Sequence, residues 1–432
     1  MNSYLIKCGK LYDGIHATLQ PDTEVLVIGN KIAEVGNSVP HPENTEIIDL
    51  SHLTVTPGMI DAHMHIHYHN WMTRRHEILF ASPEYKTLSA LRTVQKTLER
   101  GFTTIRQVGL NAYEGYGAID VRRVIEKGMF TGSRMVCCPM YLTTRGGPGD
   151  QPFDAITNPW LADRISERYP TIGSGAAQFR DITRQQIKMG ADYIKIMVSG
   201  SFMGENTSPE EFHFADDELL AIFETAHRIG KTCTAHAYGD FAVRRMVELG
   251  IDGIEHGSLI EKETIKLMEE KNTYLVPTFA PYEEIIRLDE ERLRLKPERF
   301  QNKLRRLSPQ LHKTRQMIIE SNLRLGYGSD LVTVYQCYES GIEYRNWMRD
   351  KIDPFRILKA ATSTNSEILG LQDKIGTIEK GKLADISGWK RDLLTDEDAL
   401  RDCGFVMKDG VVYPAVSSIN TDLPYTGGPV KG

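Results

Sequence analysis

The hydrophobic and polar positions of this chain change rhythm twice. Near the amino end, short apolar runs over residues 24–28 and 31–35 are separated by Gly29-Asn30, a signal typical of a hairpin turn. Near the carboxyl end, residues 376–386 and 405–413 show the same turn-punctuated, strand-like pattern. We therefore expect the two ends of the chain to pair into one small β domain.

The middle of the chain repeats a different unit, in which an apolar strand is followed by a polar loop and an amphipathic helix. In residues 216–229, for example, Leu219, Leu220, Phe223 and Ala226 are spaced for one buried helix face. Such alternation favours a parallel β/α arrangement. Strands are predicted at residues 54–60, 103–108, 135–142, 193–198, 232–237, 253–255, 274–279 and 324–327.

Eight strands alternating with helices favour a closed barrel over an open sheet. A chain of 432 residues is long enough for a barrel and a smaller companion domain. We expect an α/β fold, with a (β/α)8 TIM barrel over residues 57–369 and a small β domain formed by residues 1–56 plus 370–432.

Residues 282–322 depart from this rhythm, because they form a long helical pattern in which acidic and basic residues are closely interleaved. One interpretation is a solvated helix carrying i,i+4 ion pairs. The other is a lid or a subunit contact over the barrel mouth. We favour the solvated helix, since runs of charge usually face water.

Composition narrows the function classes. Hydrophobic residues make up 41% and charged residues 25% of the chain, which is typical of a globular protein. A net charge of -6 argues against a nucleic-acid or anionic-membrane partner. No apolar run approaches the roughly 20 residues of a membrane span. The amino end has no long apolar core or cleavage site, so we do not expect a secretory signal. Six cysteines without Cys-x-x-Cys spacing favour a reduced, cytoplasmic setting.

Two histidines stand at the end of the first predicted barrel strand, in Pro57-Gly58-Met59-Ile60-Asp61-Ala62-His63-Met64-His65. Successive side chains of a strand point to opposite faces, so His63 and His65 share one face. Two imidazoles on one face are a natural pair of metal ligands. His67 and His69 continue the alternation, but we do not expect them to be ligands.

Four further residues of ligand type fall on or at the ends of later strands: Lys195, His236, His256 and Asp330. Each could instead have a purely structural role. His236 or His256 could be a core histidine, Lys195 could form an ion pair, and Asp330 could cap a helix. The carboxyl ends of barrel strands meet at one mouth, which makes their joint occurrence in this order informative. The set predicts a metal site.

The lysine is the unusual member, because an ammonium group would repel metal ions. Burial favours the neutral amine, which can react with carbon dioxide to give an anionic carbamate. A carbamate on Lys195 could bridge two divalent ions, most naturally zinc. A hydroxide shared between the ions would then be the nucleophile, and Asp330 could accept its proton.

These motifs, together with Gly328-Ser329-Asp330 and the carboxyl-terminal strands, resemble the amidohydrolase superfamily over nearly the whole chain. The resemblance implies a barrel with a β-sandwich built from both termini. It further implies that one metal is bound by His63 and His65, the other by His236 and His256, that carbamylated Lys195 bridges them, and that Asp330 is the metal-binding acid/base residue.

Within the superfamily, residues 103–109, Ala235-His236-Ala237-Tyr238 and Ile254-Glu255-His256-Gly257 are similar to the prolidase-like branch. This branch includes Xaa-Pro dipeptidases, carboxypeptidases and an ochratoxin-hydrolysing amidase. The likeness implies that Tyr238 holds the substrate or polarises its carbonyl. A tyrosine that only packs at a strand end is an equal alternative.

Two positions depart from the branch. The loop that commonly reads Gly-Gly-His-Gly-Asp has Pro148 in place of histidine, and Gln107 replaces a more usual aspartate. Proline has no backbone N–H and no side-chain donor, so the histidine's contribution is absent or moved. Arg145 could bind a substrate carboxylate, although a solvated loop arginine is the simpler interpretation. Dipeptides are therefore uncertain substrates, while the metal chemistry is intact.

We expect an amidohydrolase that cleaves an amide bond in an N-acyl amino acid or dipeptide-like small molecule. The alternatives are a cyclic-amide or lactone hydrolase using the same site, and a catalytically silent scaffold. A mononuclear deaminase is disfavoured, because it needs no lysine on the fourth strand. Barrels of this branch often assemble, so a homo-oligomer is expected.

Overall fold

The computed structural model describes residues 2–67, 81–110, 115–150, 171–202, 207–286, 290–294, 298–332 and 337–419. Contacts divide the chain into two compact units. One comprises Met1–Gln107, Val121–Val136 and Gly326–Gly432, and the other Val108–Asp120 and Cys137–Leu325. The domain limits expected from the sequence stay a prediction.

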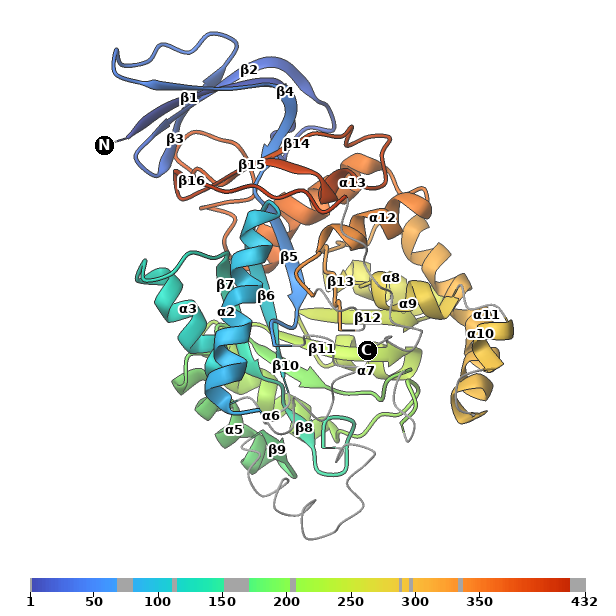
Figure 1. Ribbon diagram of the computed structural model, residues 1–432. Coiled ribbons are helices and arrows are strands. Elements are labelled where there is room, and N and C mark those ends of the chain that lie inside the picture. Colours follow the sequence, from blue (N-terminus) through green and yellow to red (C-terminus); the bar gives the residue numbers. More distant parts are fainter. Residues whose placement is uncertain are drawn as a thin grey trace. The chain divides into compact units, whose positions relative to one another are not determined.

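Both ends of the chain contribute to a seven-stranded sheet in the first unit, ordered β16-β15-β14-β4-β1-β2-β3 (Figure 1). Val25, Val27, Ile386 and Met407 share one buried core cluster, which explains why these apolar runs pair. The strands are β1 (Ser3–Leu11), β2 (Gln20–Ile28), β3 (Lys31–Gly36), β4 (Glu46–Pro57), β14 (Ile386–Trp389), β15 (Cys403–Lys408) and β16 (Val411–Tyr413).

The run predicted as the first barrel strand, residues 54–60, is divided in the structure. Its first part belongs to β4, which lies antiparallel to β14, and its last part belongs to β5 (Met59–Met64), which lies parallel to β6 (Phe102–Leu110). The break falls at Gly58, where a Cβ would stand 2.2 Å from the Thr103 hydroxyl. The predicted limits were therefore wrong: His63 lies within β5, and His65 follows it directly.

The second unit holds a parallel sheet ordered β10-β11-β12-β13, whose strands alternate with helices. The order along the chain is β10 (Ile194–Met197), α6 (Asp216–His227), β11 (Cys233–Gly239), α7 (Asp240–Glu248), β12 (Gly253–Leu259), α8 (Lys262–Glu270) and β13 (Tyr274–Val276). Every residue of β11 is buried, as expected for a strand covered on both faces. The α/β class is thus confirmed.

Two local expectations need correction. In α6, Leu219, Phe223 and Ala226 are buried as predicted. Leu220 is 38% exposed, because consecutive residues of a helix are rotated by about 100° and it therefore lies beside the buried face. The eighth predicted strand is reduced to an isolated parallel bridge between Leu325 and Leu275.

The charged segment is helical, as predicted, and forms α9 (Ala280–Ile286), α10 (Glu290–Arg294) and α11 (Glu298–Glu320). Its outer face carries ion pairs such as Arg305–Glu290 at 3.0 Å. Its inner face buries Leu304, Leu307 and Leu311 in a cluster that includes Tyr238 and Tyr282. The solvated interpretation therefore describes the outer face only.

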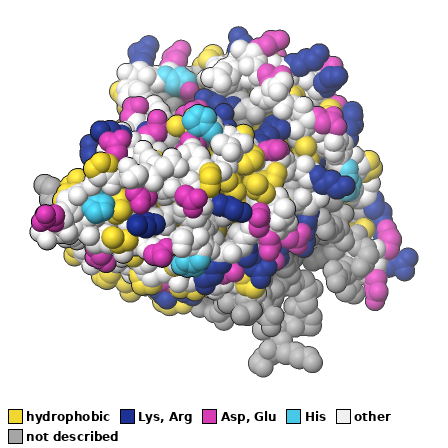
Figure 2. Space-filling view, turned by 90° about the horizontal axis from the view of Figure 1, so that it is seen from above, with side chains coloured by type: hydrophobic (Ala, Val, Ile, Leu, Met, Phe, Trp, Pro, Cys, Tyr) yellow, Lys and Arg dark blue, Asp and Glu magenta, His cyan; other side chains and the backbone are white. Residues whose placement is uncertain are grey.

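A three-stranded sheet is ordered β5-β6-β7, in which β7 is Arg134–Met140, and β8 (Thr143–Thr144) pairs in parallel with β9 (Ile172–Gly173). The remaining helices are α2 (Pro83–Glu99), α3 (Gly117–Glu126), α5 (Ala176–Lys188), α12 (Gly341–Arg349), α13 (Pro354–Lys359), η2 (Ala360–Thr364), α14 (Asn365–Ile368) and η3 (Ala399–Arg401). Among the described helices, none has the length and apolarity needed to cross a membrane. On the face shown in Figure 2, basic and acidic side chains are interspersed rather than gathered by sign.

Candidate metal centre

In the first unit, the structure brings together three predicted ligands, His63, His65 and Asp330, whose ligand atoms all lie within 4.8 Å of one another. Asp330 Oδ1 is 3.6 Å from His63 Nε2 and 3.4 Å from His65 Nε2. Two donors bound to one tetrahedral zinc ion are separated by about 3.3 Å. The donor types and their spacing therefore fit a divalent metal ion.

A buried aspartate, Asp61, holds the backbone of the two segments that carry these ligands. Its carboxylate accepts the backbone amides of His63 at 3.0 Å and Ser329 at 3.1 Å, and the Ser329 hydroxyl at 2.5 Å. The Asp330 amide in turn donates to the His63 carbonyl at 2.8 Å. The two ligand-bearing segments are thus tied together independently of any ion.

The strand that carries His63 is held by a further pair of polar residues on β6. Arg106, which is 2% exposed, donates to the carbonyl of Ala62 at 2.6 Å. Gln107 accepts the backbone amide of Ile66 at 3.0 Å. Gln107, where the branch more usually has aspartate, therefore anchors the turn directly after His65.

In the second unit, His236 on β11 and His256 on β12 face each other. His256 Nε2 and His236 Nδ1 are 2.9 Å apart, and the rings cross at 76°. The other nitrogen of His256, Nδ1, is 2.7 Å from the Thr278 hydroxyl oxygen. A partner on the second nitrogen orients a ligand imidazole, so this pair also suits metal binding.

Lys195 lies on β10 with its side chain 3% exposed. Its backbone amide donates to Cys138 Sγ at 3.4 Å. Burial raises the pKa of the Cys138 thiol to about 12, so the thiol is neutral and adds no negative charge beside the lysine. The amine that the sequence predicts to react with carbon dioxide is therefore buried.

Three residues of the two groups have positive φ angles: His256 at 76°, Thr278 at 48° and Asp330 at 43°. Residues other than glycine rarely adopt this conformation, and it costs about 1–3 kcal/mol. Such strain persists where the surroundings determine the backbone, and it is concentrated at functional sites. Nothing in the sequence pattern indicated it.

Tyr238 lies against both histidines of the second unit. Its ring is stacked on His256 at 4.8 Å and 21°, and it meets His236 edge-on at 4.7 Å. The hydroxyl of Tyr282, from α9, donates a hydrogen bond to the Tyr238 hydroxyl. The phenol predicted to contact substrate therefore borders the predicted ligands.

The loop expected to contribute to specificity is described in part. Arg145 is exposed, as a solvated loop arginine would be, and its substrate role stays a prediction. The turn containing Pro148 is closed by Asp150, which accepts the Gly146 amide at 2.6 Å. Residues 151–170 and 203–206 lie outside the described residues, as does His69.

A second group of potential ligands, His227, Cys233 and Asp252, lies at the amino ends of β11 and β12, the ends remote from His236 and His256. Here Asp252 accepts the Cys233 amide at 2.8 Å and is 2.8 Å from His227 Nε2. Through these bonds, Asp252 links the end of α6 to the start of β11, so the three residues have a structural role.

Sequence reasoning missed the residues that orient the predicted ligands, chiefly Asp61, Thr278 and Tyr282. Asp61 was visible inside the His63-x-His65 motif, where a buried acid two residues before a ligand is a recognisable signal. Thr278 and Tyr282 gave none, because their roles depend on contacts between segments.

Comparison with known proteins agrees with this chemistry. The profile of the amidohydrolase family matches residues 54–422. Ochratoxinase from Aspergillus niger is 26% identical over 397 residues, covering 86% of this chain and 78% of that protein. A crystal structure of a Xaa-Pro dipeptidase with bound methionine in the active site is 28% identical, with a TM-score of 0.84 over 95% of this chain and 100% of the other. The crystal structure of A. niger ochratoxinase has a TM-score of 0.80 at 22% identity, covering 96% of each chain.

Proposed function

Because the chain belongs to the amidohydrolase family and is a hydrolase acting on carbon–nitrogen bonds, we propose that it cleaves an amide bond with two bound divalent metal ions, most naturally zinc. The observation that carries the proposal is the grouping of His63, His65 and Asp330, whose ligand atoms lie within 4.8 Å of one another. This donor set suits a hydrolytic zinc ion.

His63 and His65 would hold one ion, His236 and His256 would hold the other, and carbamylated Lys195 would be a ligand of both. The spacing of Asp330 from His65, the spacing of His236 from His256 and the burial of Lys195 support this assignment. The family's structures imply a TIM barrel with a β-sandwich domain, and we propose that the strands of this chain close into that barrel.

When bound, the two ions supply a Lewis acid for the substrate carbonyl and an activated water as nucleophile. The residues of the chain then have separate tasks. Asp330 accepts the proton of the attacking water at a carboxylate oxygen and delivers it to the leaving nitrogen. Tyr238 donates its hydroxyl proton in a hydrogen bond to the carbonyl oxygen as negative charge develops there.

The substrate class follows from the relatives. The dipeptidase structure holds methionine in its active site, and ochratoxinase is the curated relative reported above. We therefore propose an N-acyl amino acid or a dipeptide-like molecule. Pro148 replaces the branch's usual loop histidine, so substrates that depend on that histidine are expected to be poor.

The test is a substrate panel with metal as the variable. Purified protein is stripped with a chelator, reloaded with zinc, and assayed on N-acyl amino acids, dipeptides, cyclic amides and lactones, with Asp330→Asn as the inactive control. We expect about two zinc ions per chain and turnover of acyclic amides that disappears on stripping. Turnover of lactones or cyclic amides alone would support the alternative hydrolase, and turnover by stripped protein would refute the metal mechanism.

Two further expectations remain proposals. A homo-oligomer is tested by light scattering on the zinc-loaded protein, and a cytoplasmic location by fractionation. The division into residues 1–56 plus 370–432 and residues 57–369 is tested by limited proteolysis, which should cut near these limits first.

A further inference from the structure

The hydroxyl groups of Tyr282 and Tyr238 are hydrogen-bonded to each other, with Tyr282 as the donor. Both side chains are buried at 4% exposure, and their rings lie 5.8 Å apart at 88°. A phenol has one proton to donate and lone pairs that accept. A Tyr238 oxygen that accepts from Tyr282 therefore keeps its own proton for another acceptor.

The ring of Tyr238 is fixed by its two histidine neighbours, His256 on its face and His236 on its edge. These contacts leave one torsion undetermined, the rotation of the hydroxyl hydrogen about the C–O bond. The bond from Tyr282 occupies one lone pair of that oxygen and so restricts where the hydrogen can point.

We propose that Tyr282 is a positioning residue for the hydrolytic reaction, which directs the Tyr238 hydroxyl proton toward the substrate carbonyl. This inference rests on the proposed function, in which Tyr238 is the residue that touches substrate. Tyr282 itself acts only through Tyr238.

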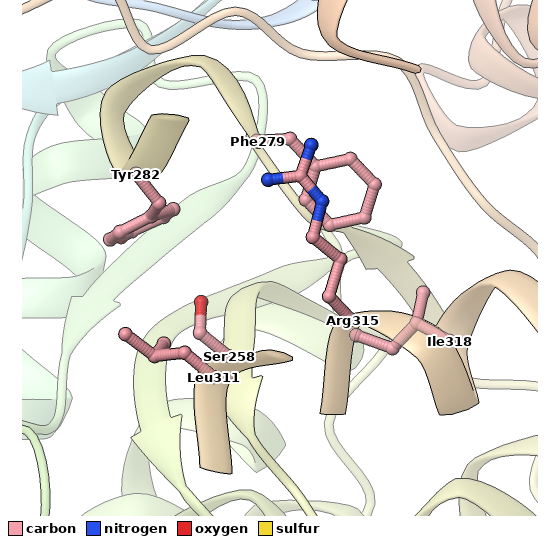
Figure 3. Close-up of a pocket in the computed structure, with 6 residues that line it drawn as sticks. All are labelled: Ser258, Phe279, Tyr282, Leu311, Arg315 and Ile318. Carbon is pink, nitrogen blue, oxygen red and sulfur yellow. The ribbon is translucent and has the colours of Figure 1, made fainter. Parts of the chain in front are cut away.

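The surroundings show why Tyr282 can hold this position. Phe202 packs edge-on against both tyrosines, at 5.1 Å from Tyr238 and 5.7 Å from Tyr282. The residue after Tyr282 is Glu283, and its carboxylate is 3.2 Å from the guanidinium of Arg315 on α11. Arg315 also lies over the Phe279 ring, as Figure 3 shows. The inner face of the charged segment thus supports the tyrosine pair.

On another side, Tyr282 borders a small hollow of about 10 Å³, room for about one water molecule (Figure 3). The hydroxyl bond to Tyr238 adds to the ring contacts that hold Tyr282 beside this hollow. Its lining consists of Ser258, Phe279, Tyr282, Leu311, Arg315 and Ile318. Loss of the hydroxyl is therefore expected to loosen the pair without disturbing the histidines.

The experiment is a double-mutant cycle in zinc-loaded protein, with Tyr282→Phe, Tyr238→Phe and the double variant. The panel substrate with the highest kcat/KM is used, and kcat, KM, zinc content and Tm are measured for each protein. Tyr344→Phe is the matched control, because it also removes a buried hydroxyl, one that donates to the Leu393 carbonyl in the other unit.

We expect Tyr282→Phe to lower kcat about five- to tenfold with KM and zinc content unchanged, the effect of one hydrogen bond. Tyr238→Phe should lower kcat about 10²–10³-fold, as expected for loss of a donor to the developing charge. In the Tyr238→Phe background, Tyr282→Phe should change kcat less than twofold, because a positioning residue has nothing left to position. Tyr344→Phe should leave kcat unchanged.

Each contrary result has a distinct meaning. An equal loss from Tyr282→Phe in both backgrounds, or an unchanged kcat in the single variant, overturns the inference while the proposed function stands. A loss of kcat that follows zinc content or Tm assigns Tyr282 a merely structural role and also overturns it. Absence of panel turnover by zinc-loaded wild type refutes the proposed function itself, and the inference with it.

Discussion

The hydroxyl of Ser329 donates a 2.5 Å hydrogen bond to the carboxylate of Asp61, inside the first unit. Asp61 also accepts the backbone amides of His63 and Ser329. Burial raises the pKa of Asp61 to about 6, and its hydrogen bonds act in the opposite direction. One buried side chain therefore joins the strand carrying His63 to the segment that leads into Asp330.

Replacing Asp61 by Asn should weaken zinc binding. The amide nitrogen cannot accept a hydrogen bond, so the tie to Ser329 or to the His63 amide is lost. We expect zinc affinity to fall about 10–100-fold and the free energy of unfolding to fall by about 1–3 kcal/mol. Calorimetric zinc titration and urea unfolding measure the two effects.

Two variants separate these effects. Ser329→Ala removes one hydrogen bond to Asp61 and should lower zinc affinity less than Asp61→Asn. Asp252→Asn weakens a comparable hydrogen bond, from the Cys233 amide to the Asp252 carboxylate. This bond lies in the second unit, at the strand ends remote from His236 and His256. The substitution should destabilise the fold with zinc affinity unchanged. Equal zinc affinity in Asp61→Asn and wild type would contradict the role given to Asp61.

Lys195→Ala should remove both the carbamate and the bridged metal pair. We expect zinc content to fall from about two ions per chain to one or fewer, with hydrolysis abolished. A carbamate carbon signal in ¹³C NMR under labelled bicarbonate should vanish with the substitution. Lys408→Ala is the control, because Lys408 is likewise a buried lysine, in the other unit. Full activity in Lys195→Ala would refute the mechanism.

The sequence was most informative where a local period carries the signal. The turn at Gly29-Asn30, the buried face of α6 apart from Leu220, and the helical character of residues 282–322 all follow from spacings within one segment. The grouping of His63 and His65 follows from strand alternation, and Asp330 joins them in the structure. Each of these depends on one residue's chemistry and its place in a repeat.

The rest depends on contacts between segments distant in the chain. Whether residues 54–57 belong to β4 or β5 is decided by pairing with β14, more than 300 residues away. The strained backbone at Thr278 and the bond between Tyr282 and Tyr238 arise only when separate segments pack together. A single sequence carries no local signal for such pairs.

Thr278→Val should weaken the second metal position selectively. The hydroxyl of Thr278 is 2.7 Å from His256 Nδ1, and valine keeps the β-branched shape while removing that partner. Without it, the imidazole is less well oriented, and affinity for one zinc ion should fall about 10–100-fold. Competition with a chromophoric chelator resolves the two zinc affinities.

The control for this variant is Thr314→Val. Thr314 lies on the inner face of α11, and its buried hydroxyl donates a hydrogen bond to the Ile260 carbonyl. The substitution should leave both zinc affinities at the wild-type value. An equal loss at both zinc positions in Thr278→Val would indicate a general disturbance rather than an effect on His256.

The buried ion pair between Glu283 and Arg315 should behave differently when one partner or both are replaced. The side chains are 6% and 9% exposed, and the charged atoms lie 3.2 Å apart. Glu283→Gln leaves the Arg315 charge without its buried counter-charge, which should cost about 3–5 kcal/mol of unfolding free energy. The double variant Glu283→Leu with Arg315→Met removes both charges and should recover most of that loss.

An exposed pair on the same segment provides the comparison. Glu290 lies 3.0 Å from Arg305, but their side chains are 62% and 44% exposed, so Glu290→Gln should lower the free energy of unfolding far less than Glu283→Gln does. Urea unfolding followed by fluorescence measures all four proteins. Because Glu283 follows Tyr282 in α9, Glu283→Gln should also lower kcat, and the double variant should restore it in part. A double variant as unstable as the single would show that Arg315 stabilises the segment by its contact with Phe279 instead.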